Sequence, residues 1–257
     1  MPIRYFQYFF FGLLLGFAGF TFAQDEEECD LEEDTRAYSE NFSTSDCRFL
    51  DRQPALSREN PYFIMEPGWQ YVLEGEEDEE FIRVEITVLD ETEMVAGVRT
   101  RVIEEREFID GELYEVARNY FAICSATNDI YYFGEDVDFY EDGEVINHNG
   151  TWRVGENGAT PGILIPGTIL VGARYYQEVA EDVAQDRAEI MEITEVEIDG
   201  ELYENVLVLM ESSPLSEPCD AELKYYAPGI GNIIDEELEL VEAGFIFRHN
   251  PYLPLKN

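Results

Sequence analysis

The chain has 257 residues, with 57 aspartates and glutamates against 16 lysines and arginines, and a formal net charge of −41. This charge excludes a nucleic-acid partner and docking on anionic lipid, because both need clustered basic side chains. Apolar residues make up 45% of the chain and aromatic residues 14%. That is enough apolar surface for a hydrophobic core, so disorder over most of the chain is excluded as well.

The first 23 residues have the pattern of a signal peptide. Arg4 is followed by the apolar stretch Tyr8–Phe22, and the small residues Thr21 and Ala23 flank Phe22 ahead of a cleavage point at Gln24. The apolar stretch is short for a membrane span, which needs roughly 20 residues. Cleavage is therefore favoured over a retained anchor. We expect a secreted or periplasmic protein without a transmembrane segment after cleavage.

Residues 24–60 are predicted to form an acidic, irregular leader that carries two of the four cysteines. An even number of cysteines in an exported chain indicates two disulfides, although reduced thiols are the alternative. The four residues Cys29, Cys47, Cys124 and Cys219 allow three pairings. We favour Cys29–Cys47 and Cys124–Cys219, because the first would close a local loop in the leader.

From Pro61 onward the chain alternates between apolar and polar residues. In Phe81–Leu89 every second residue from Ile82 to Val88 is apolar, which is typical of a half-buried antiparallel strand. Only Val179–Glu189 has the pattern of a short helix. The alternation predicts further strands at Val98–Glu105, Leu113–Cys124, Ile130–Phe133, Asn205–Glu211, Leu223–Ala227 and Glu237–Val241. We therefore predict a mainly β, antiparallel fold.

Three Asp-Gly pairs lie between apolar stretches, at Asp110-Gly111, Asp142-Gly143 and Asp199-Gly200. Glycine reaches positive φ without a steric clash of a Cβ atom, so Asp-Gly between two strands is a strong hairpin signal. Each of the three pairs is predicted to be the tip of a β-hairpin.

The sequence also predicts an internal repeat. Pro67–Tyr71 matches Val171–Tyr175 at an offset of 104 residues. Further matches pair Glu85-Ile86 with Glu189-Ile190, Val102 with Val206 and, after one insertion, Tyr120–Ala122 with Tyr225–Ala227. We expect two similar β halves, 61–150 and 151–245, and a C-terminal tail, 246–257. They would form a curved sheet, a sandwich or a half-barrel, unless the likeness between acidic strands is coincidental.

Four segments carry a resemblance to known proteins. Tyr131–Asp138, Pro161–Gly167, Gly172–Glu178 and Tyr225–Gly231, in this order, resemble a group of uncharacterised, exported, β-rich bacterial proteins over about residues 60–242. The last segment is also similar to the ending of periplasmic half-barrel proteins, which are curved antiparallel sheets that hold apolar ligands. Neither resemblance implies catalytic residues.

The best candidate for a metal site is the acidic group Glu135, Asp136, Asp138 and Asp142. Closely spaced carboxylate oxygens suit Ca²⁺, so calcium is the cofactor that the sequence allows. Reading Asp138 as the first position of an EF-hand loop places Asp142 at the fifth position, but the third and twelfth positions do not fit. The alternative is a solvated acidic hairpin.

A catalytic site is the less favoured interpretation. His148, Tyr175, Tyr176 and Glu178 could act as general base and acid in a polysaccharide lyase if folding brought them together. No sequence motif of a nucleophilic, zinc-dependent or phosphate-binding enzyme is present. This alternative makes the protein an extracellular polysaccharide-degrading enzyme, either a lyase or a hydrolase.

Aromatic residues favour a binding function instead. Aromatic rings on a sheet can stack on sugar rings or line an apolar cleft, although they also pack in cores. We single out Tyr132, Trp152 and Tyr176 as the ligand-facing set. The favoured function is a non-catalytic binding or structural module for a carbohydrate or an apolar small molecule. A surface or matrix protein without any cleft is the third possibility.

Overall fold

The computed structural model describes residues 37–52, 60–216 and 221–247, and within these ranges it contains strands and no helix. The predicted mainly β, antiparallel fold is confirmed. Accordingly, the described part contains no helix that is long and apolar enough to cross a membrane. The strands are β1 (Phe49–Leu50), β2 (Trp69–Glu77), β3 (Glu80–Val95), β4 (Val98–Ile109), β5 (Glu112–Cys124), β6 (Ile130–Glu141), β7 (Glu144–Asn147), β8 (Trp152–Arg153), β9 (Thr160–Ile165), β10 (Arg174–Tyr176), β11 (Glu178–Val179), β12 (Arg187–Ile198), β13 (Glu201–Ser212), β14 (Glu222–Ala227), β15 (Gly231–Asp235) and β16 (Leu238–Phe245).

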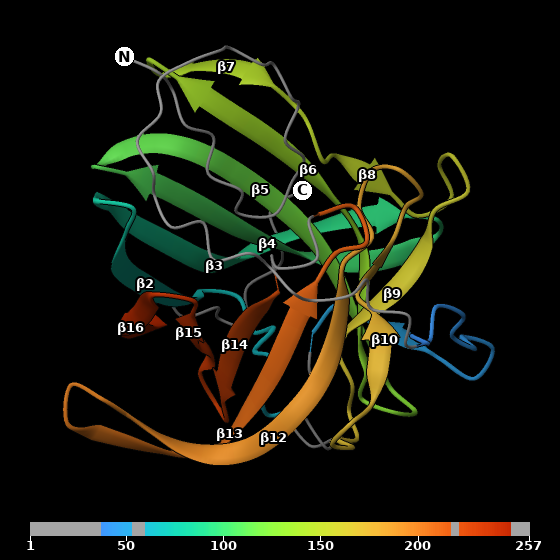
Figure 1. Ribbon diagram of the computed structural model, residues 1–257. Helices are drawn as coiled ribbons and strands as arrows, with labels where there is room; N and C mark the ends of the chain where they lie inside the picture. Colours follow the sequence, from blue (N-terminus) through green and yellow to red (C-terminus); the bar gives the residue numbers. More distant parts are fainter. Residues whose placement is uncertain (1–36, 53–59, 217–220, 248–257) are drawn as a thin grey trace, which may run out of the picture.

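All strands belong to one strongly curved sheet. Its order is β10-β12-β13-β14-β15-β16-β2-β3-β4-β5-β6-β9-β11, and in addition β1 pairs with β5 while β7 and β8 pair with β6. Figure 1 shows β3 to β6 facing β12 to β14 across an interior. The two ends of the order, β10 and β11, are separated in the chain by Gln177 alone. The sheet is therefore nearly closed, and we call residues 174–179 the seam.

The three predicted Asp-Gly hairpins are confirmed. Asp110, Asp142 and Asp199 have φ of 51°, 53° and 52°, and the glycine after each also has positive φ. Positive φ at both central residues defines the turn whose twist matches that of the two strands. The short helix predicted at Val179–Glu189 is wrong: this stretch contains β11, a turn and the start of β12.

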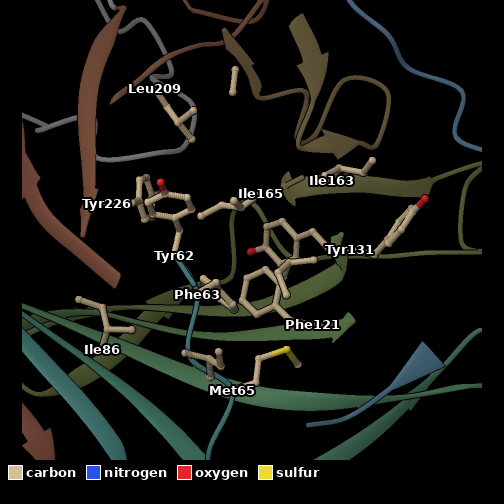
Figure 2. Packing of buried hydrophobic residues seen from close by; sticks show 14 of the residues in the cluster. Tyr62, Phe63, Met65, Ile86, Phe121, Tyr131, Ile163, Ile165, Leu209 and Tyr226 are labelled. Carbon is tan, nitrogen blue, oxygen red and sulfur yellow. The ribbon is translucent and has the colours of Figure 1, made fainter. Parts of the chain in front are cut away.

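A segment that begins with a turn, residues 60–65, passes through the interior of the sheet. Figure 2 shows Tyr62, Phe63 and Met65 on this segment, between Phe121 on one side and Tyr226 on the other. The rings of Phe63 and Phe121 lie 5.0 Å apart, and Met65 is completely buried. The segment fills one part of the interior with apolar side chains and leaves another part open.

The favoured disulfide pairing is wrong. Cys47 bonds to Cys124, with their Cα atoms 5.0 Å apart, while Cys29 and Cys219 lie outside the described residues. Sequence spacing favoured a local loop, but β1 pairs with β5 and thereby places Cys47 beside the end of β5. The part of the leader from residue 37 to residue 52 therefore packs on the sheet.

The two halves have the same strand order. In the sheet, β2-β3-β4-β5 and β10-β12-β13-β14 follow one another in the same sense. The Gly68 amide donates to the Val88 carbonyl at 2.8 Å, and the Gly172 amide donates to the Ile190 carbonyl at 2.7 Å. Both glycines end a turn and precede the first strand of their half. A duplication remains our prediction, and these paired turns support it.

Candidate ligand-binding cavity

The curved sheet encloses a cavity of about 140 Å³ in the part of the interior that residues 60–65 leave open. Its wall combines aromatic rings with acids. The aromatic residues on the wall are Phe63, Tyr71, Phe121, Tyr132 and Tyr226. Seven carboxyl groups line it, from Glu105, Glu115, Glu135, Glu178, Asp186, Glu211 and Asp235, and Lys224 is the single basic residue among the lining residues.

Lys224 neutralises two of these acids, Glu211 and Asp235, which we call the lysine carboxyls. The lysine Nζ lies 3.1 Å from Asp235 Oδ2 and 3.5 Å from Glu211 Oε2. Gln177 Nε2 donates to Glu211 Oε1 at 2.6 Å, and Asn232 Nδ2 donates to Asp235 Oδ2 at 3.1 Å. Burial by itself lowers the pKa of Lys224, but the two carboxylates outweigh it and raise that pKa above its usual range.

A second group, the seam carboxyls Glu135, Glu178 and Asp186, has no such partner. Within the described residues none of the three forms an ion pair. Tyr132 donates to Glu135 Oε2 at 3.0 Å, and Trp152 Nε1 donates to Glu178 Oε1 at 3.3 Å. Burial, strengthened by mutual repulsion, raises the pKa of Glu135 and Glu178 well above the ordinary range, and burial raises that of Asp186 to about 6.

Two glycines allow close backbone approaches near the seam carboxyls. A Cβ atom on Gly134 would lie 2.3 Å from the Trp152 carbonyl oxygen, and one on Gly162 would lie 2.1 Å from the Gln177 carbonyl oxygen. The first approach lets β8 pair with β6, so that Trp152 lies opposite Glu135. The second lets β9 pass beside Gln177. A side chain at Gly134 would push β8 away from β6, and one at Gly162 would push the seam away from β9.

The acids of β4 and β5 extend the wall away from the seam. The side chain of Glu105 is accessible to solvent, yet protein atoms surround it on all sides. Both hold for a side chain that faces the space inside a cavity. This enclosure raises the pKa of Glu105 to about 7. Burial likewise raises the pKa of Glu107 to about 8 and that of Glu115 well above its usual range. The interior therefore holds protons at neutral pH.

The aromatic rings form a continuous row beside these acids. Phe121 stacks on Tyr132 with ring centroids 4.5 Å apart, and Tyr132 meets Trp152 edge to face at 5.4 Å. Phe63 in turn meets Phe121 edge to face. The row thus runs from the segment inside the sheet to the seam carboxyls, and it gives the cavity an apolar wall that ends at acids.

The predicted ligand-facing set is only partly gathered at this cavity. Tyr132 lines it, and Trp152 contacts Tyr132 and donates to a lining glutamate. Tyr176 lies on β10, with its ring 6.2 Å from that of Tyr38, and is not among the lining residues. Tyr132 and Trp152 are therefore the two members whose position fits a ligand site.

The predicted metal ligands do not share one face of β6. Glu135 faces the cavity, whereas Asp136 forms an ion pair with an arginine of β8 and Asp138 contacts a histidine at 2.7 Å. Asp142 lies in the turn after β6. Alternate residues of a strand point to opposite faces, which separates Glu135 from its two neighbours. In the described ranges no three His, Cys, Asp or Glu side chains are arranged to hold a metal ion. Calcium binding remains a prediction.

The residues of the catalytic alternative have separate surroundings. His148 is 68% exposed and contacts Asp138. Tyr175 is buried and donates to a backbone carbonyl of β9 at 3.3 Å, and Tyr176 packs against the leader. Glu178 alone lines the cavity. No contact connects His148 to either tyrosine or to the glutamate within the described residues.

Sequence reasoning missed the lysine carboxyls and the acids of β4 and β5. One signal was available: the chain contains only two lysines, and Lys224 is placed in the middle of a predicted strand. A charged residue in a strand of an otherwise apolar pattern indicates a buried pair. The acids could not be found in this way, because acids are frequent on both faces of most strands.

The fold and the cavity together define a class of protein: a nearly closed antiparallel sheet around a small polar and aromatic cavity. Neither a family model, nor a curated protein, nor a solved structure matches the chain. The chemistry of the cavity itself is therefore the basis for assigning a function.

Proposed function

We propose that the protein is a non-catalytic binding module that takes up a small molecule inside its curved sheet. The observation that carries this proposal is the cavity of about 140 Å³, whose wall combines aromatic rings with converging acids. A pocket in which apolar walls meet convergent polar groups and acids of raised pKa is the usual candidate for a small-ligand site. A core filled for stability alone would not leave space beside buried acids.

The volume limits the ligand to about one ring with a short substituent. An apolar cavity of about 150 Å³ in another protein accommodates benzene. The cavity therefore suits an aromatic molecule or a single sugar ring, and it is too small for a polysaccharide chain. Of the ligands expected from the sequence, a small molecule fits this space better than a polymer.

Export remains part of the proposal. The signal-peptide pattern favours a secreted or periplasmic location, and the Cys47–Cys124 bond supports an oxidising compartment. An exported protein with an internal cavity would carry or sequester a small molecule outside the cytoplasm.

A fragment screen tests the proposal. Single-ring compounds, read out by thermal shift and by binding isotherms, should include some that stabilise the protein. Ala117→Phe should abolish this binding, because Ala117 lines the cavity and is only 5% exposed. If the phenylalanine at position 117 prevents folding, Ala117→Leu is used as a smaller cavity-filling variant. Val145→Phe, at an exposed position of β7, is the control and should bind normally.

Two outcomes would overturn the proposal. One is that no fragment stabilises the wild-type protein at millimolar concentration. The other is that the folded Ala117 variants bind the same fragments as tightly as the wild-type protein does, which would place the binding outside the cavity.

A further inference from the structure

The cavity has an excess of acid that the fold itself does not neutralise. Seven carboxyl groups and one lysine line it, and this lysine already pairs with Glu211 and Asp235. The seam carboxyls have no basic side chain within ion-pair distance among the described residues. An occupant that brings a positive charge would complete this end of the cavity, as Lys224 completes the other.

Buried oxygen atoms at the seam also lack hydrogen-bond donors. Glu135 Oε1, Glu178 Oε2 and Asp186 Oδ2 have no donor among the described residues, and the three residues are 3%, 3% and 6% exposed. Glu178 and Asp186 can hydrogen-bond each other only while one of them keeps a proton. Unsatisfied buried acceptors are rare in native proteins, because each costs about 1–3 kcal/mol. Three of them at one end of a cavity indicate a missing donor.

The row of aromatic rings specifies the rest of the occupant. Tyr132 lies beside Glu135, and Trp152 beside Glu178. A ring face attracts positive charge, whereas a ring edge does not, so a cation lying over the face of Tyr132 or Trp152 would be stabilised further. Phe121 and Phe63 continue the wall away from the acids. The occupant would therefore carry its charge at one end and an apolar ring at the other.

We propose that the cavity binds a small organic ammonium ion with an aromatic or aliphatic body, a proposal that rests on the proposed binding function. The ammonium group donates to the seam carboxyls, and the apolar body lies along Phe121 and Phe63. An ammonium group has three N–H donors, and the seam carboxyls offer three of the six lining acceptors that lack a partner, the others being Glu115 Oε2, Asn232 Oδ1 and Asp235 Oδ1. A bare metal ion is less suitable, because Ca²⁺ needs six to eight oxygens and no such group is arranged within the described residues.

Three probes of one shape test the charge requirement. Benzylamine is cationic at neutral pH, benzyl alcohol is its neutral counterpart and benzoate its anionic one. We expect calorimetry to show benzylamine binding at least tenfold more tightly than benzyl alcohol, and benzoate not binding. Calcium chloride is added as a competitor and should not displace benzylamine beyond the effect of matched ionic strength with NaCl.

Matched variants test the location. Glu135→Gln and Glu178→Gln should each weaken benzylamine binding about tenfold, the size of one charged hydrogen bond, and leave benzyl alcohol binding nearly unchanged. Glu104→Gln removes the same charge from the opposite face of β4 and should leave both affinities unchanged. Each glutamine keeps the side-chain shape, so that folding is preserved.

The outcomes separate the two proposals. If benzyl alcohol binds as tightly as benzylamine and Ala117→Phe abolishes both, the cavity is a ligand site but the ammonium proposal is wrong. If calcium displaces benzylamine specifically, the site is a metal site and the ammonium proposal is again wrong. If none of the probes binds and the fragment screen is negative, both the proposed binding function and the ammonium proposal are wrong.

Discussion

The lysine carboxyls and the seam carboxyls line the same cavity and differ in what surrounds them. Glu211 lies on β13 and Asp235 on β15. Lys224 lies on β14, the strand between them in the sheet, and pairs with both. Glu135, Glu178 and Asp186 come from β6, β11 and the loop before β12, with Tyr132 and Trp152 as their donors. One end is charge-paired within the protein, and the other is not.

This difference shows how a structural acid can be distinguished from one available to a ligand. A buried carboxylate beside an ammonium group is compensated in charge, so that its role is in the fold, even where one oxygen such as Asp235 Oδ1 lacks a donor. A buried carboxyl with neutral donors alone keeps its proton and loses it when a cation arrives. The seam carboxyls are of the second kind.

The largest expected effect comes from removing the cation of the paired end. Lys224→Met should lower the free energy of unfolding by about 3–5 kcal/mol at pH 8, because it leaves two buried carboxyl groups without compensation. Denaturant titration measures this loss. Adding Glu211→Gln and Asp235→Asn to the variant should restore most of the stability. A loss below about 1 kcal/mol would mean that Lys224 is not the partner that distinguishes the two ends.

The acids without a cation predict that stability falls as pH rises. The folded-state pKa is about 6 for Asp186 and about 8 for Glu107, which are both buried, against ordinary values of 3.8 and 4.5. The folded protein thus binds more protons than the unfolded chain, so this contribution is full below pH 4 and is lost as pH rises to about 8. We expect a decrease of about 2–4 kcal/mol between pH 5 and pH 8. Unfolding curves at constant high NaCl measure it, and a flat or rising profile would contradict the assignment.

Replacing one such acid should raise stability at high pH only. Glu107 is 4% exposed, has an oxygen without a hydrogen-bond partner and forms no ion pair within the described residues. Glu107→Gln should therefore add about 1–3 kcal/mol at pH 9 and nearly nothing at pH 5, where the carboxyl is already neutral. Glu104→Gln, on the other face of the same strand, is the control and should change stability little at either pH. An equal gain at both pH values would show that charge burial is not the cause.

The smallest effect is expected on the outside of the sheet. Arg83 pairs with Glu74 and, at 2.9 Å, with Glu85, but its side chain is 33% exposed. Solvent screens such pairs, so Arg83→Gln should cost less than about 1 kcal/mol, and NaCl should reduce this cost further. The loss of unfolding free energy caused by Lys224→Met should persist at the same NaCl concentration. Similar salt sensitivity of the two variants would indicate that the cavity is open to bulk ions.

Local sequence signals predicted the strands and several turns correctly. The alternation in Phe81–Leu89 and the pairs Asp110-Gly111 and Asp199-Gly200 act over a few residues, and the neighbouring chain is enough to decide them. The helix expected at Val179–Glu189 failed because the closure of the sheet competes with local propensity: Gln177 and Glu178 both donate from their backbone amides to the Asp186 carbonyl. The predicted disulfide pairing was wrong for a related reason: the pairing of β1 with β5, and not closeness in sequence, decided the partner of Cys47.

The sequence by itself determined the all-β class, the hairpin tips and a large excess of acid, because period-two hydrophobicity, Asp-Gly turns and composition are local or additive properties. Only the tertiary structure decided which of the 57 acidic residues face the cavity. Strands far apart in the chain meet when the sheet curves and closes at Gln177, and this closure brings Glu135 to Glu178 and Asp186. The same closure places Lys224 beside two other acids. The charge balance at each end of the cavity depends on distances between these strands, and no pattern along one strand encodes them.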